Sequence, residues 1–155
     1  MLRKAKLSDV EEIFNLIEFW AKKGKLLRRS LNYIYENLRD FWVYEERGKI
    51  VGACSLHIVG WQSLAEVKCL AVKKNFQKRG IGKSLVEICL KEAKELGVRK
   101  VFALSFEEIF FKKLGFRKID KKKLPSKIWG ECVNCIYFPQ ECGEQAFIKL
   151  VKKGG

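Results

Sequence analysis

The segment from Val67 to Gly97 constrains the fold of this chain more than any other part of its sequence. It starts with the apolar run Val67-Lys68-Cys69-Leu70-Ala71-Val72, passes through Gln77-Lys78-Arg79-Gly80-Ile81-Gly82, and continues with apolar residues at helical spacing. This pattern predicts a buried strand, a glycine-containing loop and an amphipathic helix that ends at Gly97. Such a loop collects backbone N–H groups at a helix N-terminus, where the helix dipole favours a phosphate or pyrophosphate.

The composition of the loop narrows the kind of anion site. Its cations are Lys78, Arg79 and Lys83, and its glycines, which admit a ligand close to the backbone, are Gly80 and Gly82. A P-loop would need a glycine where the chain has Asn75-Phe76-Gln77. A dinucleotide fingerprint would need a third glycine at Leu85. The loop therefore matches neither the P-loop nor the dinucleotide-binding pattern. The pattern that it does show is Q-x-x-G-x-G, from Gln77 to Gly82.

The rest of the chain supplies further strands and helices. We expect helices after Ser8 (a capping box with Glu11), after Ser30 and near residues 107–114. Strands are expected near residues 2–7, 41–44, 50–59, 65–72, 101–104, 116–119 and 146–151, with a hairpin turn at 46–49. This order predicts an α/β (α+β) fold with a mixed central sheet and helices on both faces.

The 155 residues suit one domain, residues 1–155, whose part from 120 to 155 differs in composition and carries a cysteine cluster. The first residues carry charge throughout, and no window is apolar enough to span a bilayer, so we expect a cytoplasmic protein without a membrane partner. The net charge of +14 would attract polyanions, but a lysine-rich soluble surface explains it equally well.

Three elements resemble the GNAT acetyltransferase superfamily. They are the Gln77–Gly82 loop, the Leu70-Ala71-Val72 run before it, and Phe110-Phe111-Lys112-Lys113-Leu114-Gly115-Phe116, which is similar to that family's "F-Y-x-x-x-G-F" element. The resemblance covers roughly residues 1–120. It implies acetyl-CoA as co-substrate, bound by Leu70, Ala71, Val72, Gln77, Lys78, Arg79, Gly80, Ile81, Gly82, Lys83, Phe110 and Phe111.

Other segments resemble the acetyltransferase domain of N-acetylglutamate synthases, which begin arginine biosynthesis. They are Leu26-Leu27-Arg28-Arg29-Ser30, Glu66 followed by Cys69–Val72, and Leu104-Ser105 before Phe110-Phe111. The stretch from Lys127 through Cys132-x-x-Cys135 to Glu144 looks like the tail of the short, stand-alone members. The resemblance implies transfer of an acetyl group to the α-amine of L-glutamate.

Roles for individual residues follow from that chemistry. Glu66 is the candidate general base, although it could also be an exposed strand carboxylate. Ser105 is the candidate proton donor to the leaving thiolate, or it caps the helix near Glu107. The N–H of Leu70 would polarise the thioester oxygen. For the acceptor carboxylates the candidates are Arg29, Lys68 and Lys127. His57, the single histidine, is expected to fill structure.

The six cysteines fall into two groups. Cys54, Cys69 and Cys89 lie singly in apolar stretches and are expected to be small core residues. Cys132, Cys135 and Cys142 could bind zinc with a fourth ligand from Glu144, Cys69 or a second chain, or could form a disulfide or stay reduced.

Other functions stay open at this point. A different GNAT acceptor, such as a protein N-terminus, a lysine or a small amine, is the main alternative. A non-catalytic basic domain that binds RNA or a partner is a remote one, because no stretch interleaves Trp61 or Trp129 with basic residues, and we expect no nucleic-acid partner. Family members are often dimers, so a homodimer is a further expectation.

Overall fold

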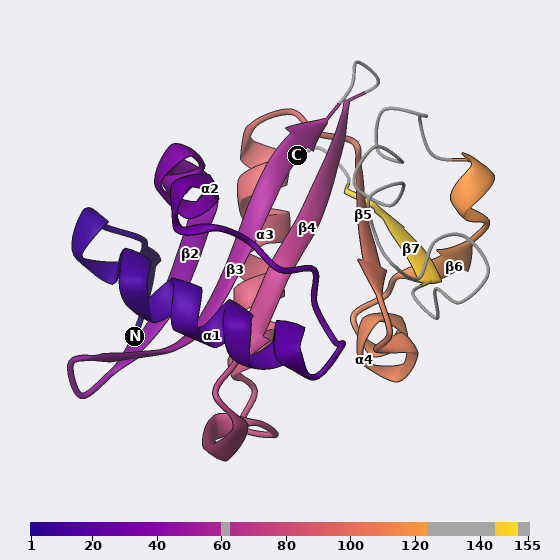
Figure 1. The fold of residues 1–155 in the computed structure, drawn as a ribbon. Helices are drawn as coiled ribbons and strands as arrows, with labels where there is room; N and C mark the ends of the chain where they lie inside the picture. The colour runs from indigo at the N-terminus through magenta and orange to yellow at the C-terminus, as the bar shows by residue number, and fades with distance from the viewer. Residues whose placement is uncertain (60–62, 124–144, 152–155) are drawn as a thin grey trace. The chain divides into compact units, whose positions relative to one another are not determined.

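The computed structural model describes residues 1–59, 63–123 and 145–151 (Figure 1). Its helices are α1 (Val10–Lys22), α2 (Leu31–Glu36), α3 (Ile81–Glu95) and α4 (Glu108–Lys113). Its strands are β1 (Leu2–Lys4), β2 (Phe41–Glu46), β3 (Lys49–Val59), β4 (Leu64–Val72), β5 (Lys100–Ser105), β6 (Arg117–Ile119) and β7 (Gln145–Leu150). Short 3-10 turns cover Leu7–Asp9, Leu38–Asp40, Lys74–Phe76 and Lys121–Lys123.

The strands form a mixed sheet in the order β1-β2-β3-β4-β5-β7-β6. β4 and β5 run parallel, with Leu64 opposite Lys100 and Glu66 opposite Phe102. β1 with β2, β2 with β3, β5 with β7 and β6 with β7 are antiparallel. The mixed sheet expected from the sequence is confirmed. That the last strand of the chain inserts between β5 and β6 could not be predicted from the periodicity of the sequence.

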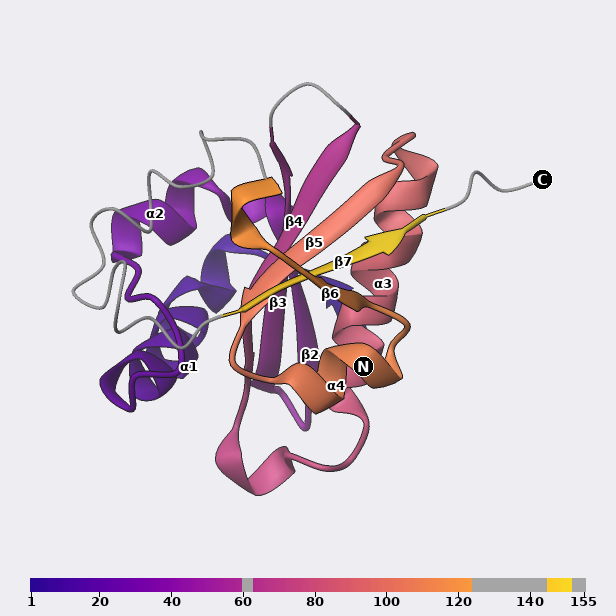
Figure 2. The ribbon, with the colours of Figure 1, turned by 90° about the vertical axis from the view of Figure 1, so that its right-hand side faces the viewer.

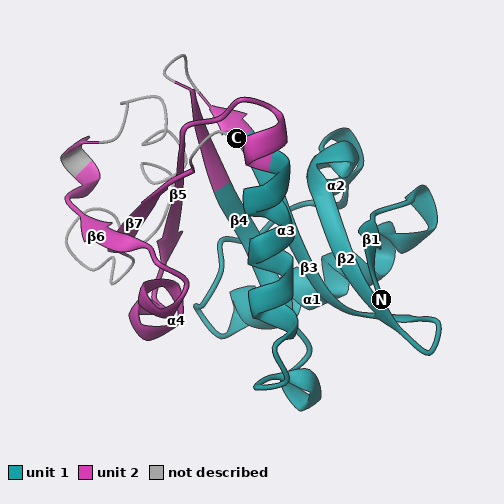
Figure 3. Ribbon diagram, turned by 180° about the vertical axis from the view of Figure 1, so that it is seen from behind, with its two compact units in different colours: residues 1–57, 67–92 teal, residues 58–66, 93–155 magenta. Residues whose placement is uncertain are grey.

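The chain divides into two compact units (Figure 3). Unit 1 consists of Met1–His57 and Val67–Glu92, and unit 2 of Ile58–Glu66 and Ala93–Gly155. The chain therefore passes between the units three times: within β3 after His57, within β4 after Glu66, and within α3 after Glu92.

In unit 1, helices cover both faces of the strands. α1 and α2 lie against one face and α3 against the other (Figures 1 and 3). The buried stripe of α1 is Val10, Ile13, Leu16 and Ile17. It packs against apolar residues of the strands and of α2, namely Phe41, Val43, Ile50, Ala53, Cys69, Ala71 and Ile34.

The predicted capping box of the first helix is wrong. Ser8 lies in a 3-10 turn, and α1 begins only at Val10. The Asp9 carboxylate accepts a hydrogen bond from the Lys6 backbone N–H at 2.7 Å and pairs with the Arg3 guanidinium at 2.8 Å. This bond from Arg3 lowers the pKa of the Asp9 carboxyl. Capping rules consider only residues at the helix end itself, so they could not anticipate that Arg3 of β1 would pair with Asp9.

In unit 2, β7 lies between β5 and β6 (Figure 2). Leu64, Phe102 and Ala146 form one buried apolar cluster of unit 2, and Val59, Leu104, Ile119 and Ile148 pack against it. The Phe111 ring of α4 stacks on Phe147 with centroids 5.7 Å apart and meets Phe116 edge to face at 5.1 Å. Aromatic packing thus fixes α4 against the antiparallel strands.

Within the described residues, no helix is both long enough and apolar enough to cross a membrane.

Candidate active site

The loop after β4 leads directly into the N-terminus of α3. Lys78 and Gly80 adopt positive φ angles of 64° and 82°. The Ser84 N–H donates to the Gly80 carbonyl at 3.0 Å, so the helical hydrogen bonding of α3 starts at Gly80. Gly82 lies in the first turn of α3 and not in the loop where we expected it. The first amides of a helix have no acceptor within it, and those of α3 are available to an anion.

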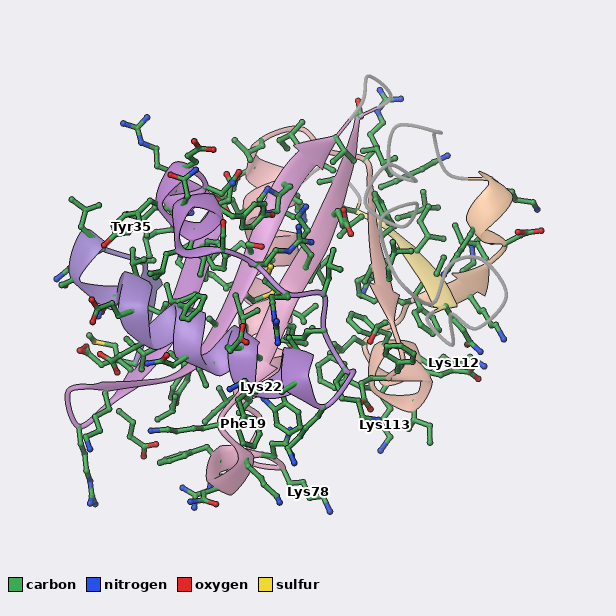
Figure 4. The ribbon with its side chains drawn as sticks, viewed as in Figure 1. Phe19, Lys22, Tyr35, Lys78, Lys112 and Lys113 are labelled. Carbon is green, nitrogen blue, oxygen red and sulfur yellow. The ribbon has the colours of Figure 1, made fainter. Side chains whose placement is uncertain are left out.

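The surroundings of Gly80 fit a phosphate-bearing ligand. A Cβ at this position would meet no atom within 4 Å, so the backbone is open to a close approach. Gln77, Lys78, Arg79 and Lys83 are exposed, and Lys78 extends outward from the loop (Figure 4). The Arg79 guanidinium lies over the Phe76 ring, 4.8 Å from its centroid.

Gly52 of β3 sets how closely the start of α3 approaches the sheet. An ideal Cβ at Gly52 would lie 2.9 Å from Ile81 Cγ2 and 3.0 Å from Leu85 Cδ1, both closer than side-chain packing allows. Ile81 and Leu85 are buried. Gly52 thus places the helix N-terminus relative to β3.

We expect Gly52→Val to displace that N-terminus. Overpacking of this kind lowers the free energy of unfolding by about 1–3 kcal/mol. The shift of the helix amides should also raise the KM for acetyl-CoA about tenfold, which corresponds to a loss of about 1.4 kcal/mol in binding free energy. Urea unfolding and steady-state kinetics measure the two effects. Gly48→Ala, at a hairpin glycine with open space around it, is the control, since its cost should be confined to stability. An unchanged KM for acetyl-CoA in Gly52→Val would contradict the expectation that the N-terminus of α3 binds acetyl-CoA.

β4 is distorted next to the residues expected to contact the co-substrate. Cys69 has a φ of 58°, a left-handed conformation that non-glycine residues rarely adopt within a strand. A residue of this kind re-aims the neighbouring peptide groups, as in a bulge. Leu70, Ala71 and Val72 follow it, and the Trp20 indole N–H donates to the Val72 carbonyl at 3.0 Å. The end of β4 is thereby fixed to α1.

Arg29 and Lys68 come together at one aromatic ring in unit 1. The Ser30 hydroxyl caps α2 by accepting from the Tyr33 N–H at 3.0 Å, as the sequence predicted. The Arg29 guanidinium lies 4.5 Å from the Tyr33 ring centroid and the Lys68 ammonium 5.6 Å from it. Burial raises the pKa of the Tyr33 hydroxyl, while the two positive charges act in the opposite direction. Sequence reasoning missed Tyr33, whose only signal is its place three residues after the helix cap.

His57 belongs to a buried hydrogen-bonded group beside Tyr33. Its Nδ1 lies 3.0 Å from the Asp40 carboxylate, and its Nε2 lies 3.0 Å from Ser55 Oγ and 3.4 Å from the Tyr33 hydroxyl. Ser55 Oγ donates to the Lys68 carbonyl at 3.0 Å. His57 is 8% exposed and Ser55 is fully buried.

In unit 2, the two proposed catalytic side chains lie on the paired strands β4 and β5. Glu66 is only 5% exposed, so the alternative of an exposed strand carboxylate is wrong. Ser105 ends β5, and its hydroxyl accepts a hydrogen bond from the Glu107 N–H at 3.0 Å. This N–H belongs to the residue before α4, which begins at Glu108, so Ser105 does not cap the helix as the alternative expected. Because the Ser105 oxygen only accepts here, the hydroxyl proton stays available for donation.

Phe110 and Phe111 have different environments. Phe111 is 2% exposed and packs among the aromatic rings of unit 2. Phe110 is half-buried and meets Phe111 edge to face at 5.1 Å. Of the two, Phe110 has the ring that a ligand could reach.

Cys54, Cys69 and Cys89 are buried free thiols, as predicted. The Cys54 and Cys89 sulfurs lie 3.8 Å apart, and this contact together with burial raises the pKa of the Cys54 thiol well above its usual value. Lys127, Cys132, Cys135 and Cys142 lie outside the described residues. Among the residues that the structure does describe, no cluster of three or more His, Cys, Asp or Glu side chains could hold a metal ion.

Sequence comparison identifies the family. Residues 37–118 match the model of the acetyltransferase (GNAT) domain. The chain belongs to the GNAT acetyltransferase family. An uncharacterized N-acetyltransferase of Chlorobaculum tepidum is 38% identical over 152 residues, which is 97% of this chain and 96% of that protein. The amino-acid acetyltransferase of Mycobacterium tuberculosis is 35% identical over 134 residues, covering 84% of this chain and 76% of the relative.

Solved structures agree with this membership. Rv2747 from Mycobacterium tuberculosis, crystallised with CoA and the ligand NLQ, superposes with a TM-score of 0.85 at 29% identity, over 98% of this chain and 99% of that one. N-acetylglutamate synthase from Neisseria gonorrhoeae, in complex with coenzyme A and N-acetyl-glutamate, gives a TM-score of 0.90 at 24% identity, over 99% of this chain and 35% of that one. The second likeness shows the GNAT fold alone. As a GNAT family member, the protein is an acyltransferase.

Proposed function

We propose that this protein is an acetyl-CoA-dependent amino-acid N-acetyltransferase whose acceptor is L-glutamate. The observation that carries the proposal is the convergence of Arg29 and Lys68 on the Tyr33 ring. Two cations held at one partly buried aromatic group suit a carboxylate-bearing acceptor. The relatives named amino-acid acetyltransferase support the same substrate class.

The residues of unit 1 are assigned to binding. Acetyl-CoA supplies the acetyl group as a thioester. The amides at the start of α3, with Lys78, Arg79 and Lys83, bind its pyrophosphate, and the backbone of Leu70–Val72 pairs with its pantetheine arm. The Leu70 N–H, next to the left-handed residue Cys69, donates to the carbonyl that accepts negative charge during transfer. Arg29 and Lys68 bind the acceptor carboxylates.

The residues of unit 2 are assigned to proton transfer. Glu66 takes the proton from the acceptor ammonium, directly or through a water, because only the free amine has a lone pair for attack. Ser105 gives a proton to the departing thiolate, with its oxygen held by the Glu107 N–H. The amine nitrogen gains the acetyl group as the carbon–sulfur bond breaks, and CoA leaves as the thiol. The second proton of that nitrogen returns to the Ser105 oxygen, directly or through water, and restores the hydroxyl.

The charge of the chain suits an acidic acceptor. The net charge is +14, and a positive field raises the local concentration of anions while it repels cationic amines. A dicarboxylate such as glutamate keeps a net negative charge with its ammonium group protonated. A polyamine acceptor would meet repulsion from the same field.

A thiol-release assay tests the proposal. The purified protein is mixed with acetyl-CoA and, in separate reactions, with L-glutamate, L-glutamine, L-aspartate, other amino acids, small amines and peptides. We expect turnover with L-glutamate above all other acceptors. Turnover confined to another amino acid would keep the amino-acid acetyltransferase and reject glutamate. Turnover confined to amines or peptides would reject the amino-acid class altogether.

A further inference from the structure

His57 lies at the junction of two arms of the binding residues in unit 1. One arm runs from its Nε2 to the Tyr33 hydroxyl, and Arg29 and Lys68 lie over the Tyr33 ring. The other runs through Ser55 Oγ to the Lys68 carbonyl. That carbonyl belongs to the residue immediately before Cys69, the left-handed residue of β4. The His57 imidazole therefore lies next to Tyr33, the ring that Arg29 and Lys68 contact, and next to Ser55, which bonds the distorted strand β4.

The proton inventory of this group shows how the ring is held. Nδ1 faces the Asp40 carboxylate at 3.0 Å and must carry a proton to bond it. The Lys68 carbonyl can only accept, so the Ser55 hydroxyl donates its one proton there. Nε2 then bonds Ser55 by donating, or bonds Tyr33 by accepting. Asp40 thus fixes the orientation of the ring, and Nε2 then holds either Ser55 or Tyr33 by a hydrogen bond.

Burial gives this arrangement energetic weight. His57 and Ser55 are buried, so removing the partner of either leaves a polar group without water to replace it. Asp40, in contrast, has a side chain that is 41% exposed, so it can be changed without opening the core. Two titratable groups contact the His57 ring, Asp40 from the turn before β2 and Tyr33 from α2. The charged or titratable groups around Tyr33 are Arg29, which precedes α2, and Lys68 and Cys69 from β4.

We propose that His57 is a positioning residue of this enzyme: anchored by Asp40, it holds Tyr33 or, through Ser55, the Lys68 backbone, and so sets the place of the acceptor-binding cations. The inference rests on the proposed function, because it assigns those cations to an acceptor carboxylate. It replaces the expectation that His57 only fills structure. His57 makes no contact with the reacting atoms in this proposal and acts through Tyr33 and Lys68.

Three substitutions of His57 separate its contacts. His57→Asn keeps an amide within reach of Asp40, His57→Gln places one near the Nε2 position, and His57→Leu removes both. We expect the acceptor KM to rise about tenfold or more in the Asn and Leu variants, the effect of losing one buried hydrogen bond. The Gln variant should stay within about threefold, and the KM for acetyl-CoA within about twofold throughout. Asp40→Ala should raise the acceptor KM, with Glu36→Ala at an exposed carboxylate of α2 as the control.

A spectroscopic measurement is independent of turnover. Because His57 is the only histidine, ¹⁵N NMR of histidine-labelled protein reports its ring nitrogens without overlap. We expect a protonated, hydrogen-bonded Nδ1 that loses this signature in Asp40→Ala, and ring signals that shift when the acceptor is added. Acceptor KM values within twofold of the wild type in the Asn and Leu variants, or equal losses for acceptor and acetyl-CoA, would overturn the inference while wild-type turnover stands. A wild type that acetylates no carboxylate-bearing acceptor would instead overturn the proposed function, and the inference with it.

Discussion

Glu66→Gln should lower kcat/KM for the acceptor by about 10²- to 10⁴-fold, the range that a positioned general base contributes. The substitution keeps the size of the side chain and removes its basicity. Glu66 is 5% exposed in β4, so the amide also fits the buried position without new volume. Steady-state kinetics at saturating acetyl-CoA measure the loss. The KM for acetyl-CoA should change little, because the base acts on the other substrate.

The pH dependence distinguishes a base from a structural carboxylate. As the pH rises, solvent deprotonates more of the acceptor amine, and an amine that is already free needs no base. The deficit of Glu66→Gln should therefore shrink with increasing pH. Glu95→Gln, an exposed carboxylate at the end of α3, is the matched control and should be indistinguishable from the wild type. A deficit that stays constant across pH would reject the assignment of Glu66 as the base.

Arg29→Ala should raise the acceptor KM about 10- to 100-fold, because hydrogen bonds to a charged group contribute about 1.5–3 kcal/mol. The guanidinium lies 4.5 Å from the Tyr33 ring centroid, which holds it at the acceptor-binding group. Arg29→Lys keeps the charge but loses the planar fork, so an intermediate KM is expected. Kinetics with L-glutamate as the varied substrate give the values.

The neighbouring residue provides the control for Arg29. Arg28 has the same charge, a side chain that is 66% exposed, and an ion pair with Glu18 at 3.0 Å. Exposed pairs of this kind contribute little, so Arg28→Ala should leave the acceptor KM within about twofold. If both alanine variants raise the KM equally, the effect is one of overall charge, and the specific role of Arg29 is disproved.

Local patterns in the sequence predicted the elements that local physics controls. The Gln77–Gly82 pattern predicted the loop, and the positive φ of Gly80 and the start of α3 next to it agree with that prediction. Ser30 as the cap of α2, Gly97 after α3 and the hairpin turn at Arg47 and Gly48 are also confirmed. Each depends on backbone geometry and hydrogen bonds within a few residues, which the identity of those residues largely determines.

Long-range partners decided what these patterns could not. Asp9 displaced Ser8 at the start of α1 because Arg3 of β1 reaches it. Tyr33, Asp40 and the β3 pair Ser55 and His57 come from three separate segments, and no spacing rule relates these segments. Cys69 adopts a left-handed conformation that its residue type disfavours.

The sequence by itself therefore determined the family, the order of the elements and the glycine-containing loop before α3, since these are set by residues close together along the chain. Only the tertiary structure decided the burial of Glu66, the convergence of Arg29 and Lys68 on Tyr33, and the insertion of β7 between β5 and β6. The physical reason is that these features depend on strand pairing and packing between distant segments, whose energy no local window of sequence contains.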